Sequence, residues 1–210
     1  MTRLQALEAR WYASLRKGKP DYSVYDGEGY MEEALKCWKL YSRKYIRSLT
    51  TLKLPGIFRV VDLGCGCGWS TRALEEAFGG ATVTGTNREG SDQYRYCKAH
   101  GIRVVGSIEL IKGKVDLVFA SEYFEHFERP IEHVTDIVTR LKPRYLVVAN
   151  SFGTRATGHF LAYRHGAEVI DGKAMGRRFN ARLREMFYTR RETGFWNNRP
   201  AVWEMTGEKA

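Results

Sequence analysis

The nine residues from Val60 to Gly68 constrain the fold more than any other part of this chain. They read VVDLGCGCG, so an apolar run contains a single acidic residue, Asp62, and glycine then recurs at alternate positions. A buried parallel strand is typically a near-continuous apolar run. Glycines after such a strand let the backbone turn sharply and let a ligand approach without a Cβ in its way. The sequence therefore predicts a strand, a ligand-binding turn and a helix with free N-terminal N–H groups.

The glycine spacing excludes two familiar phosphate-binding loops. A dinucleotide-binding turn has the pattern G-x-G-x-x-G, whereas this loop has glycine at 64, 66 and 68. A P-loop ends in Gly-Lys followed by Ser or Thr, whereas this loop continues from Gly68 into Trp69 and Ser70. We therefore expect a ligand other than a nucleoside triphosphate or a dinucleotide.

Apolar runs and amphipathic segments alternate along the middle of the chain. Short apolar runs predict strands at 58–64, 81–86, 102–105, 115–121 and 144–152. Helical spacing of apolar residues predicts helices at 70–78, 93–100 and 131–141. This alternation is typical of an α/β domain with a doubly wound, mostly parallel sheet. A helix at 177–187 and an antiparallel hairpin of 188–196 with 201–207 would complete a seven-stranded sheet.

Residues 1–57 are expected to form a basic, aromatic and helical N-terminal extension to a domain at 58–210. Helical spacing predicts one helix over 28–48, and two shorter helical or irregular pieces are expected around 4–15. Aromatic residues crowd this extension. We expect them either to act as a lid that stacks on a ring or base, or to pack as core: Trp11, Tyr12, Tyr22, Tyr25 and Tyr30.

The segment DLGCGCG after a strand resembles the first motif of class I S-adenosylmethionine-dependent methyltransferases, and the resemblance extends over about residues 58–152. It implies a Rossmann-like fold in which Gly64, Gly66 and Gly68 pass under the methionine part of the cofactor and Asp62 supports either the amino group of the cofactor or the loop. The family usually has an acidic residue at the end of the second strand, where this chain has Asn87. Further residues then implied around the cofactor are Cys65, Ser107, Ile108 and Ser121.

Glu122, Glu125 and His126 follow the fourth predicted strand directly. Their spacing places them on one face of a helical turn, where they could bind a divalent cation or supply a general base. The E-x-x-E-H pattern is similar to that of small-RNA and ubiquinone-pathway O-methyltransferases, in which it is associated with a metal. His159 is the best-placed further ligand, ahead of His133 and His165. Alternatively, His126 closes the cofactor pocket and no metal binds.

The chain has a formal net charge of +10, and the excess of basic over acidic residues lies in its two flanks. Residues 1–57 carry 11 Lys/Arg and 6 Asp/Glu, and residues 155–199 carry 10 and 4, whereas residues 58–154 carry 12 of each. We expect an anionic acceptor, RNA or DNA among the candidates, that contacts Arg177, Arg178 and Arg182. The alternatives are a small-molecule O-methyltransferase and a non-catalytic binding subunit, the latter favoured by Asn87 and Ser107.

The remaining features concern chemistry and location. The fourth strand is followed by Ser121-Glu122-Tyr123-Phe124, which lacks the Asn/Asp-Pro-Pro-Tyr segment of amino-directed DNA methyltransferases. No Pro-Cys nucleophile of the cytosine C5 enzymes occurs there either. Four cysteines are too few for a disulfide scaffold, so we expect reduced thiols. No apolar stretch of ~18 residues and no leader-like N-terminus is present, which predicts a cytoplasmic protein without a membrane partner.

Overall fold

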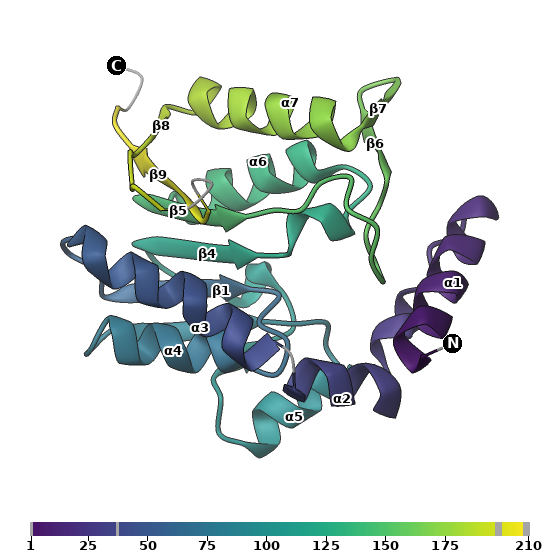
Figure 1. Ribbon diagram of the computed structural model, residues 1–210. Helices are drawn as coiled ribbons and strands as arrows, with labels where there is room; N and C mark the ends of the chain where they lie inside the picture. Colours follow the sequence, from purple (N-terminus) through teal and green to yellow (C-terminus); the bar gives the residue numbers. More distant parts are fainter. Residues whose placement is uncertain (1, 37, 196–198, 208–210) are drawn as a thin grey trace.

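A computed structural model describes residues 2–36, 38–195 and 199–207 of the chain (Figure 1). Its described part contains a seven-stranded sheet with the order β3-β2-β1-β4-β5-β9-β8. The strands are β1 Arg59–Leu63, β2 Thr82–Thr86, β3 Val104–Val105, β4 Leu117–Ser121, β5 Tyr145–Ala149, β8 Tyr188–Arg190 and β9 Ala201–Met205. Strands β1 to β5 are parallel, and β9 pairs antiparallel with β5 and with β8. The predicted doubly wound, mostly parallel sheet is confirmed.

Helices cover both faces of the sheet because strand side chains alternate between the two faces. Val60, Leu117 and Val147 belong to a core cluster with residues of α3 and α4. Val61 and Val118 pack instead with α6 and α7 on the opposite face. Figure 1 shows these two layers of helices with the sheet between them. The helices are α3 Trp38–Leu49, α4 Trp69–Ala77, α5 Asp92–Ala99, α6 Pro130–Leu141 and α7 Gly172–Glu185.

The N-terminal segment lies beyond the carboxyl ends of the parallel strands (Figure 1). It contains α1 Arg3–Arg16, the 3-10 turn η1 Tyr22–Tyr25 and α2 Glu28–Lys36. Trp11 and Val24 are fully buried in a cluster with Phe160, Tyr163 and Met175. The segment is therefore packed onto the chain that follows β5, at the edge where ligands bind in open α/β sheets. The expected boundary between residues 57 and 58 stays a prediction.

Several predicted element boundaries are wrong. The helix expected over 28–48 corresponds to α2 and α3, and Cys37 between them lies outside the described residues. One continuous helix, α1, replaces the two short pieces expected near the N-terminus. Strand β8 covers only the first three residues of the run expected over 188–196. Sequence periodicity places such boundaries poorly because caps and packing decide where an element ends.

A hairpin absent from the prediction follows β5. It consists of β6 Ala162–His165 and β7 Glu168–Asp171. Helix α7 then begins at Gly172, earlier than expected, because the Asp171 carboxylate accepts a hydrogen bond from the backbone N–H of Ala174 (2.7 Å). A Cβ at Gly172 would lie 2.4 Å from the backbone nitrogen of Gly153, so glycine permits this close contact. Across the described residues, no helix combines the length and apolar character needed to cross a membrane.

Candidate active site

The glycine loop after β1 has a left-handed backbone at each of its three predicted glycines. The φ angles are +63° at Gly64, +56° at Gly66 and +78° at Gly68, a region that favours glycine. An added Cβ at Gly64 would lie 2.6 Å from the Tyr123 ring, and one at Gly68 would lie 2.4 Å from Ile102. At Gly66 an added Cβ meets no atom within 4 Å. Gly66 is therefore the glycine that leaves open space above the loop.

Asp62 connects β1 to the first turn of α4. Its carboxylate is buried and accepts hydrogen bonds from the hydroxyls of Ser70 (2.6 Å) and Thr71 (2.7 Å). Burial raises the pKa of Asp62 to about 6, against which the two hydroxyls act. These contacts tie the end of β1 to the helix that follows the glycine loop, and a role of Asp62 toward the cofactor's amino group stays a prediction.

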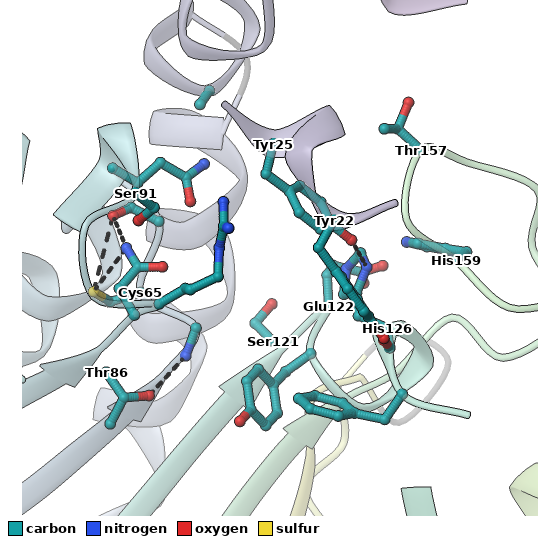
Figure 2. Close-up of a pocket in the computed structure, with 18 of the residues that line it drawn as sticks. Tyr22, Tyr25, Cys65, Thr86, Ser91, Ser121, Glu122, His126, Thr157 and His159 are labelled. Carbon is teal, nitrogen blue, oxygen red and sulfur yellow. Dashed lines mark hydrogen bonds between the residues drawn. The ribbon is translucent and has the colours of Figure 1, made fainter. Parts of the chain in front are cut away.

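A cavity of about 1280 Å³ extends from the glycine loop to the residues that follow β4 (Figure 2). In Figure 2, Cys65 and Thr86 lie on one side of it, His126 and His159 lie on the other, and Ser121 lies between them. Most residues that the sequence implied for the cofactor line this cavity: Asp62, Gly64, Cys65, Gly66, Asn87, Ser107, Ile108 and Ser121. Gly68 is not among the described lining residues and is instead the N-cap of α4.

Asn87 and Ser107 make local contacts in addition to lining the cavity. The Asn87 side-chain amide donates to the Gly66 carbonyl oxygen (2.8 Å), and the Cys97 thiol donates to the same oxygen (3.2 Å). Ser107 caps the 3-10 turn η3 Ile108–Leu110 by accepting from the backbone N–H of Glu109 (3.2 Å). Their roles toward ribose and adenine stay predictions.

Glu122, Glu125, His126 and His159 form a carboxylate–histidine cluster at the other end of the cavity. Glu122 follows β4 with φ +50°, and Glu125 and His126 lie in the 3-10 turn η4 Phe124–His126. One ligand atom each from Glu122, Glu125 and His159 lies within 4.8 Å of the others. The His126 and His159 rings meet edge to face, with centroids 4.7 Å apart. The sequence-predicted residues thus come together, although His159 is distant in sequence.

Burial sets the protonation of the cluster. Glu125 is fully buried behind the cavity wall, where its Oε1 accepts from the backbone N–H of Ser151 (2.8 Å) and its Oε2 has no partner among the described residues. Burial raises the pKa of Glu125 to about 7. Desolvation lowers the pKa of His126 to about 3, and nearby His159 acts in the same direction. The imidazole of His126 is therefore neutral near pH 7.

Tyr25 reaches the cluster from the N-terminal segment. Its hydroxyl lies 2.7 Å from Nδ1 of His126, as Figure 2 shows. Burial raises the pKa of Tyr25 well above its usual value, so the phenol keeps its proton and can donate to Nδ1. An added Cβ at Gly158 would lie 1.6 Å from the Tyr25 oxygen, so glycine is required there. Only the aromatic crowding of the extension hinted at this contact in the sequence, because the two residues are 101 positions apart.

The other histidines differ in what they contact. Nδ1 of His159 lies 3.0 Å from the Thr154 carbonyl oxygen, an acceptor, so Nδ1 carries the proton and Nε2 keeps a lone pair. Burial lowers the pKa of His159 as well. His133 lines the cavity and shares a hydrogen bond with the Tyr123 hydroxyl (2.9 Å). His165 lies on β6 and is not among the described lining residues.

Known proteins similar to this chain identify the family to which its α/β domain belongs. Residues 61–148 match the methyltransferase domain family. The chain carries a class I S-adenosylmethionine-dependent methyltransferase domain. A malonyl-[acyl-carrier protein] O-methyltransferase from Halalkalibacterium halodurans is 25% identical over 107 residues, which are 45% of this chain and 39% of that protein. The chain therefore aligns with well under half the length of that relative.

Solved methyltransferases share the fold of this domain. A magnesium protoporphyrin IX methyltransferase from Synechocystis, with S-adenosylmethionine bound, matches with a TM-score of 0.52 and 20% identity over 86% of each chain. A mitomycin 7-O-methyltransferase matches with a TM-score of 0.53 and 16% identity over 94% of this chain and 66% of that one. At these identities the likeness concerns the fold.

The cavity leaves room at the glycine loop, where the resemblance predicts the cofactor. The open space above Gly66 and the lining by Asp62, Asn87 and Ile108 form a cradle that a Cβ at position 66 would enter. The basic residues that the sequence assigned to an anionic partner lie elsewhere. Arg177, Arg178 and Arg182 are on α7, where Arg178 pairs with Glu168 (2.7 Å), and none of the three is among the described lining residues.

Proposed function

We propose that this protein is an S-adenosylmethionine-dependent O-methyltransferase that methylates a hydroxyl group of a small molecule. The observation that carries the proposal is that one continuous cavity joins the glycine loop to the carboxylate–histidine cluster. Tyr22, Tyr25 and Tyr30 of the N-terminal segment line it too, so an acceptor would be enclosed between aromatic rings and the cluster. A cavity whose surface is mainly apolar, with fewer polar groups, suits a small acceptor.

The chain's own residues bind, orient and accept a proton. S-adenosylmethionine, when bound, supplies a methyl group already activated by its sulfonium. The glycine loop and the residues at the ends of β2 and β4 would hold it. Nε2 of His159 is the group that could take the proton of an acceptor hydroxyl, because its imidazole is neutral and its Nδ1–H is fixed on the Thr154 carbonyl. Tyr25 fixes the orientation of the neighbouring His126 ring.

The charges that line the cavity favour a neutral hydroxyl over a phosphate-rich polymer. Carboxylates of Glu8, Glu109, Glu122 and Asp136 line it. The basic side chains among the described lining residues are two, Arg88 and Arg155, and Arg155 is paired with Glu8 (2.6 Å). A phosphate group would meet more negative than positive charge there. The anionic acceptor predicted from the flanking charge remains the competing outcome of the test below.

A divalent cation at the cluster is a second candidate component of this function. Carboxylate oxygens and an imidazole nitrogen suit such ions, and the convergence of Glu122, Glu125 and His159 within 4.8 Å favours it. Oε2 of Glu125 is buried and without a described partner, so an ion would satisfy it. A cation held by these three residues would polarise an acceptor hydroxyl and ease loss of its proton.

A transfer assay tests the proposal. We expect label from methyl-labelled S-adenosylmethionine to enter phenols or aliphatic alcohols as base-stable ethers, rather than RNA or DNA. His159→Gln should lower turnover by about 10²-fold or more with unchanged cofactor affinity, because the proton acceptor is lost. His165→Gln is the matched control and should behave as wild type. Labelled nucleic acid without labelled small molecules, base-labile esters, or full activity in His159→Gln would contradict the proposal.

A further inference from the structure

Arg199 brings a positive charge to the carboxylate–histidine cluster from the far end of the chain. Its Nη2 forms an ion pair with Oε1 of Glu122 and donates to the Ser151 hydroxyl (2.6 Å). The guanidinium carbon also lies 5.7 Å from the centre of the Tyr45 ring. Arg199 lies two residues before β9, which pairs with β5, and Ser151 lies two residues after β5. The sheet itself therefore carries this arginine to the cluster.

Arg199 forms an ion pair with a carboxylate that a divalent cation would need as a ligand. Glu122 supplies one of the three converging ligand atoms, and Arg199 is bonded to that same side chain. The second carboxylate, Glu125, has no basic partner among the described residues. Arg199 is therefore the basic side chain that the described residues place on a carboxylate of the cluster. A further cation near Arg199 would be repelled unless the arginine moved away from Glu122.

We propose that Arg199 is the resident counter-cation of the carboxylate–histidine cluster and that a divalent cation competes with it for Glu122. The inference rests on the metal-binding mode of the proposed function. Arg199 is thus a positioning residue: it sets the affinity of the site for a cation and holds Glu122 when none is bound. Its second hydrogen bond, to Ser151, keeps the guanidinium at the cluster.

Binding of Mn²⁺, followed by the electron paramagnetic resonance of the free ion, tests the competition without an acceptor. We expect Arg199→Met to bind Mn²⁺ at least about tenfold more tightly than wild type, because a competing charge is removed. Arg199→Lys, which keeps the charge, should stay within about threefold of wild type. Arg191→Met is the matched control: Arg191 lies in the same terminal part of the chain but pairs with Glu204. The gain should disappear in the double variant Arg199→Met/Glu122→Gln.

Two results would overturn the inference. One is equal Mn²⁺ affinity in wild type and Arg199→Met, and the other is no Mn²⁺ binding by Arg199→Met. If Arg199→Met does not fold, Ser151→Ala provides a second route, since it removes only the hydrogen bond that holds the guanidinium and should tighten binding by about threefold. Cofactor affinity and methyl transfer in the presence of a chelator are measured separately. Failure of the competition is thereby distinguished from failure of the proposed methyl transfer.

Discussion

At the scale of single residues, burial moves the ionisable groups of the site toward their neutral forms. Glu125 and Asp62 have raised pKa values, and His126 has a lowered one. In each case desolvation is the largest cause, since a charged form loses its water when it is buried. Glu125, with a pKa of about 7, is the group among these that exchanges its proton near neutral pH, and such shifts make the stability of the fold depend on pH.

Glu125→Gln should stabilise the protein at high pH only. The folded-state pKa of about 7 exceeds the ordinary value of 4.5, so the carboxyl is neutral in both states below about pH 4. As pH rises from about 4.5 to about 7, the unfolded state ionises while the folded state keeps its proton, so the stability of wild type falls relative to the neutral variant and levels off above pH 7. We expect the variant's advantage in the free energy of unfolding to grow from near zero at pH 4 to about 1–3 kcal/mol at pH 8.

Urea unfolding at the two pH values measures this difference. Glu128→Gln is the control, because Glu128 is exposed and pairs with Arg164 (2.7 Å) at the surface. Its effect should stay below about 0.5 kcal/mol at both pH values. A pH-independent effect of Glu125→Gln would contradict the assignment of a burial-raised pKa.

Gly66→Ala should remove cofactor binding while leaving the fold intact. The new methyl group would occupy the open space above the loop, and the left-handed backbone adds about 1–2 kcal/mol of strain. Gly80→Ala is the matched control, because Gly80 has φ +89° and open space around an added Cβ but is not among the described lining residues of the cavity. Titration calorimetry with S-adenosylmethionine should show loss of affinity in the first variant only. Near-normal affinity in Gly66→Ala would rule out the loop as the cofactor site.

The sequence pattern makes Gly64 and Gly66 equivalent and predicts that a valine at either position abolishes cofactor binding in a folded protein, but the structure separates the two. At position 64, however, the side chain would collide with the Tyr123 ring. Gly64→Val is therefore expected to damage folding, and only position 66 reports on the cofactor.

At the scale of elements, helix α1 holds the loop that carries His159. The Trp11 indole N–H donates to the His159 carbonyl oxygen (2.8 Å), and the Tyr12 hydroxyl contacts the Ala156 backbone. Arg155 of the same loop pairs with Glu8 (2.6 Å). The loop lacks a strand or helix of its own over 154–160, so these contacts from α1 fix it. The N-terminal segment is thus part of the site and more than a cover.

Trp11→Phe should slow methyl transfer without weakening cofactor binding. Phenylalanine keeps an aromatic ring in the core but leaves the buried carbonyl unpaired, which costs about 1–3 kcal/mol. We expect turnover to fall by about tenfold or more as His159 loses its position. Hydrogen exchange at 154–160 should rise. Trp203→Phe, at an equally buried tryptophan of β9, should lower stability without changing exchange there. Unchanged exchange in Trp11→Phe would contradict the role of α1.

At the scale of the whole molecule, the basic residues of the second flank, 155–199, lie on different surfaces. Arg155 lines the cavity, whereas Arg177, Arg178 and Arg182 are on helix α7 and are not among the described lining residues. Arg178 and Arg182 form ion pairs with Glu168 (2.7 Å) and Glu185 (3.2 Å). The net charge of +10 is therefore no measure of the charge at the site.

Replacing Arg177, Arg178 and Arg182 together by Ala separates a small acceptor from a nucleic acid. With a small acceptor, KM and cofactor affinity should stay within about twofold of wild type, because surface ion pairs contribute little. With a nucleic-acid acceptor, binding should weaken steeply as the salt concentration rises. The triple variant should flatten that slope, because a protein that contacts fewer phosphates releases fewer counterions when it binds. Filter binding of RNA and DNA between low and physiological salt distinguishes the two outcomes.

The sequence by itself determined the parallel strands of the central sheet and the turn after the first of them. Local patterns suffice there: apolar runs such as 115–121 form buried strands, and the glycines after Asp62 allow the left-handed backbone of a sharp turn. The same local signals placed Glu122, Glu125 and His126 together, because they are neighbours in the chain. Element ends were less predictable, as α7 shows, since its N-terminus depends on the Asp171 cap and on the approach of Gly172 to Gly153.

Only the tertiary structure decided which distant side chains complete the site. Tyr25, His159 and Arg199 reach the residues after β4 from three separate parts of the chain. No local pattern encodes such contacts, because they depend on how α1, the 154–160 loop and β9 pack around the sheet. Packing also set the protonation of Glu125 and His126, since burial, and not residue type, shifts their pKa values.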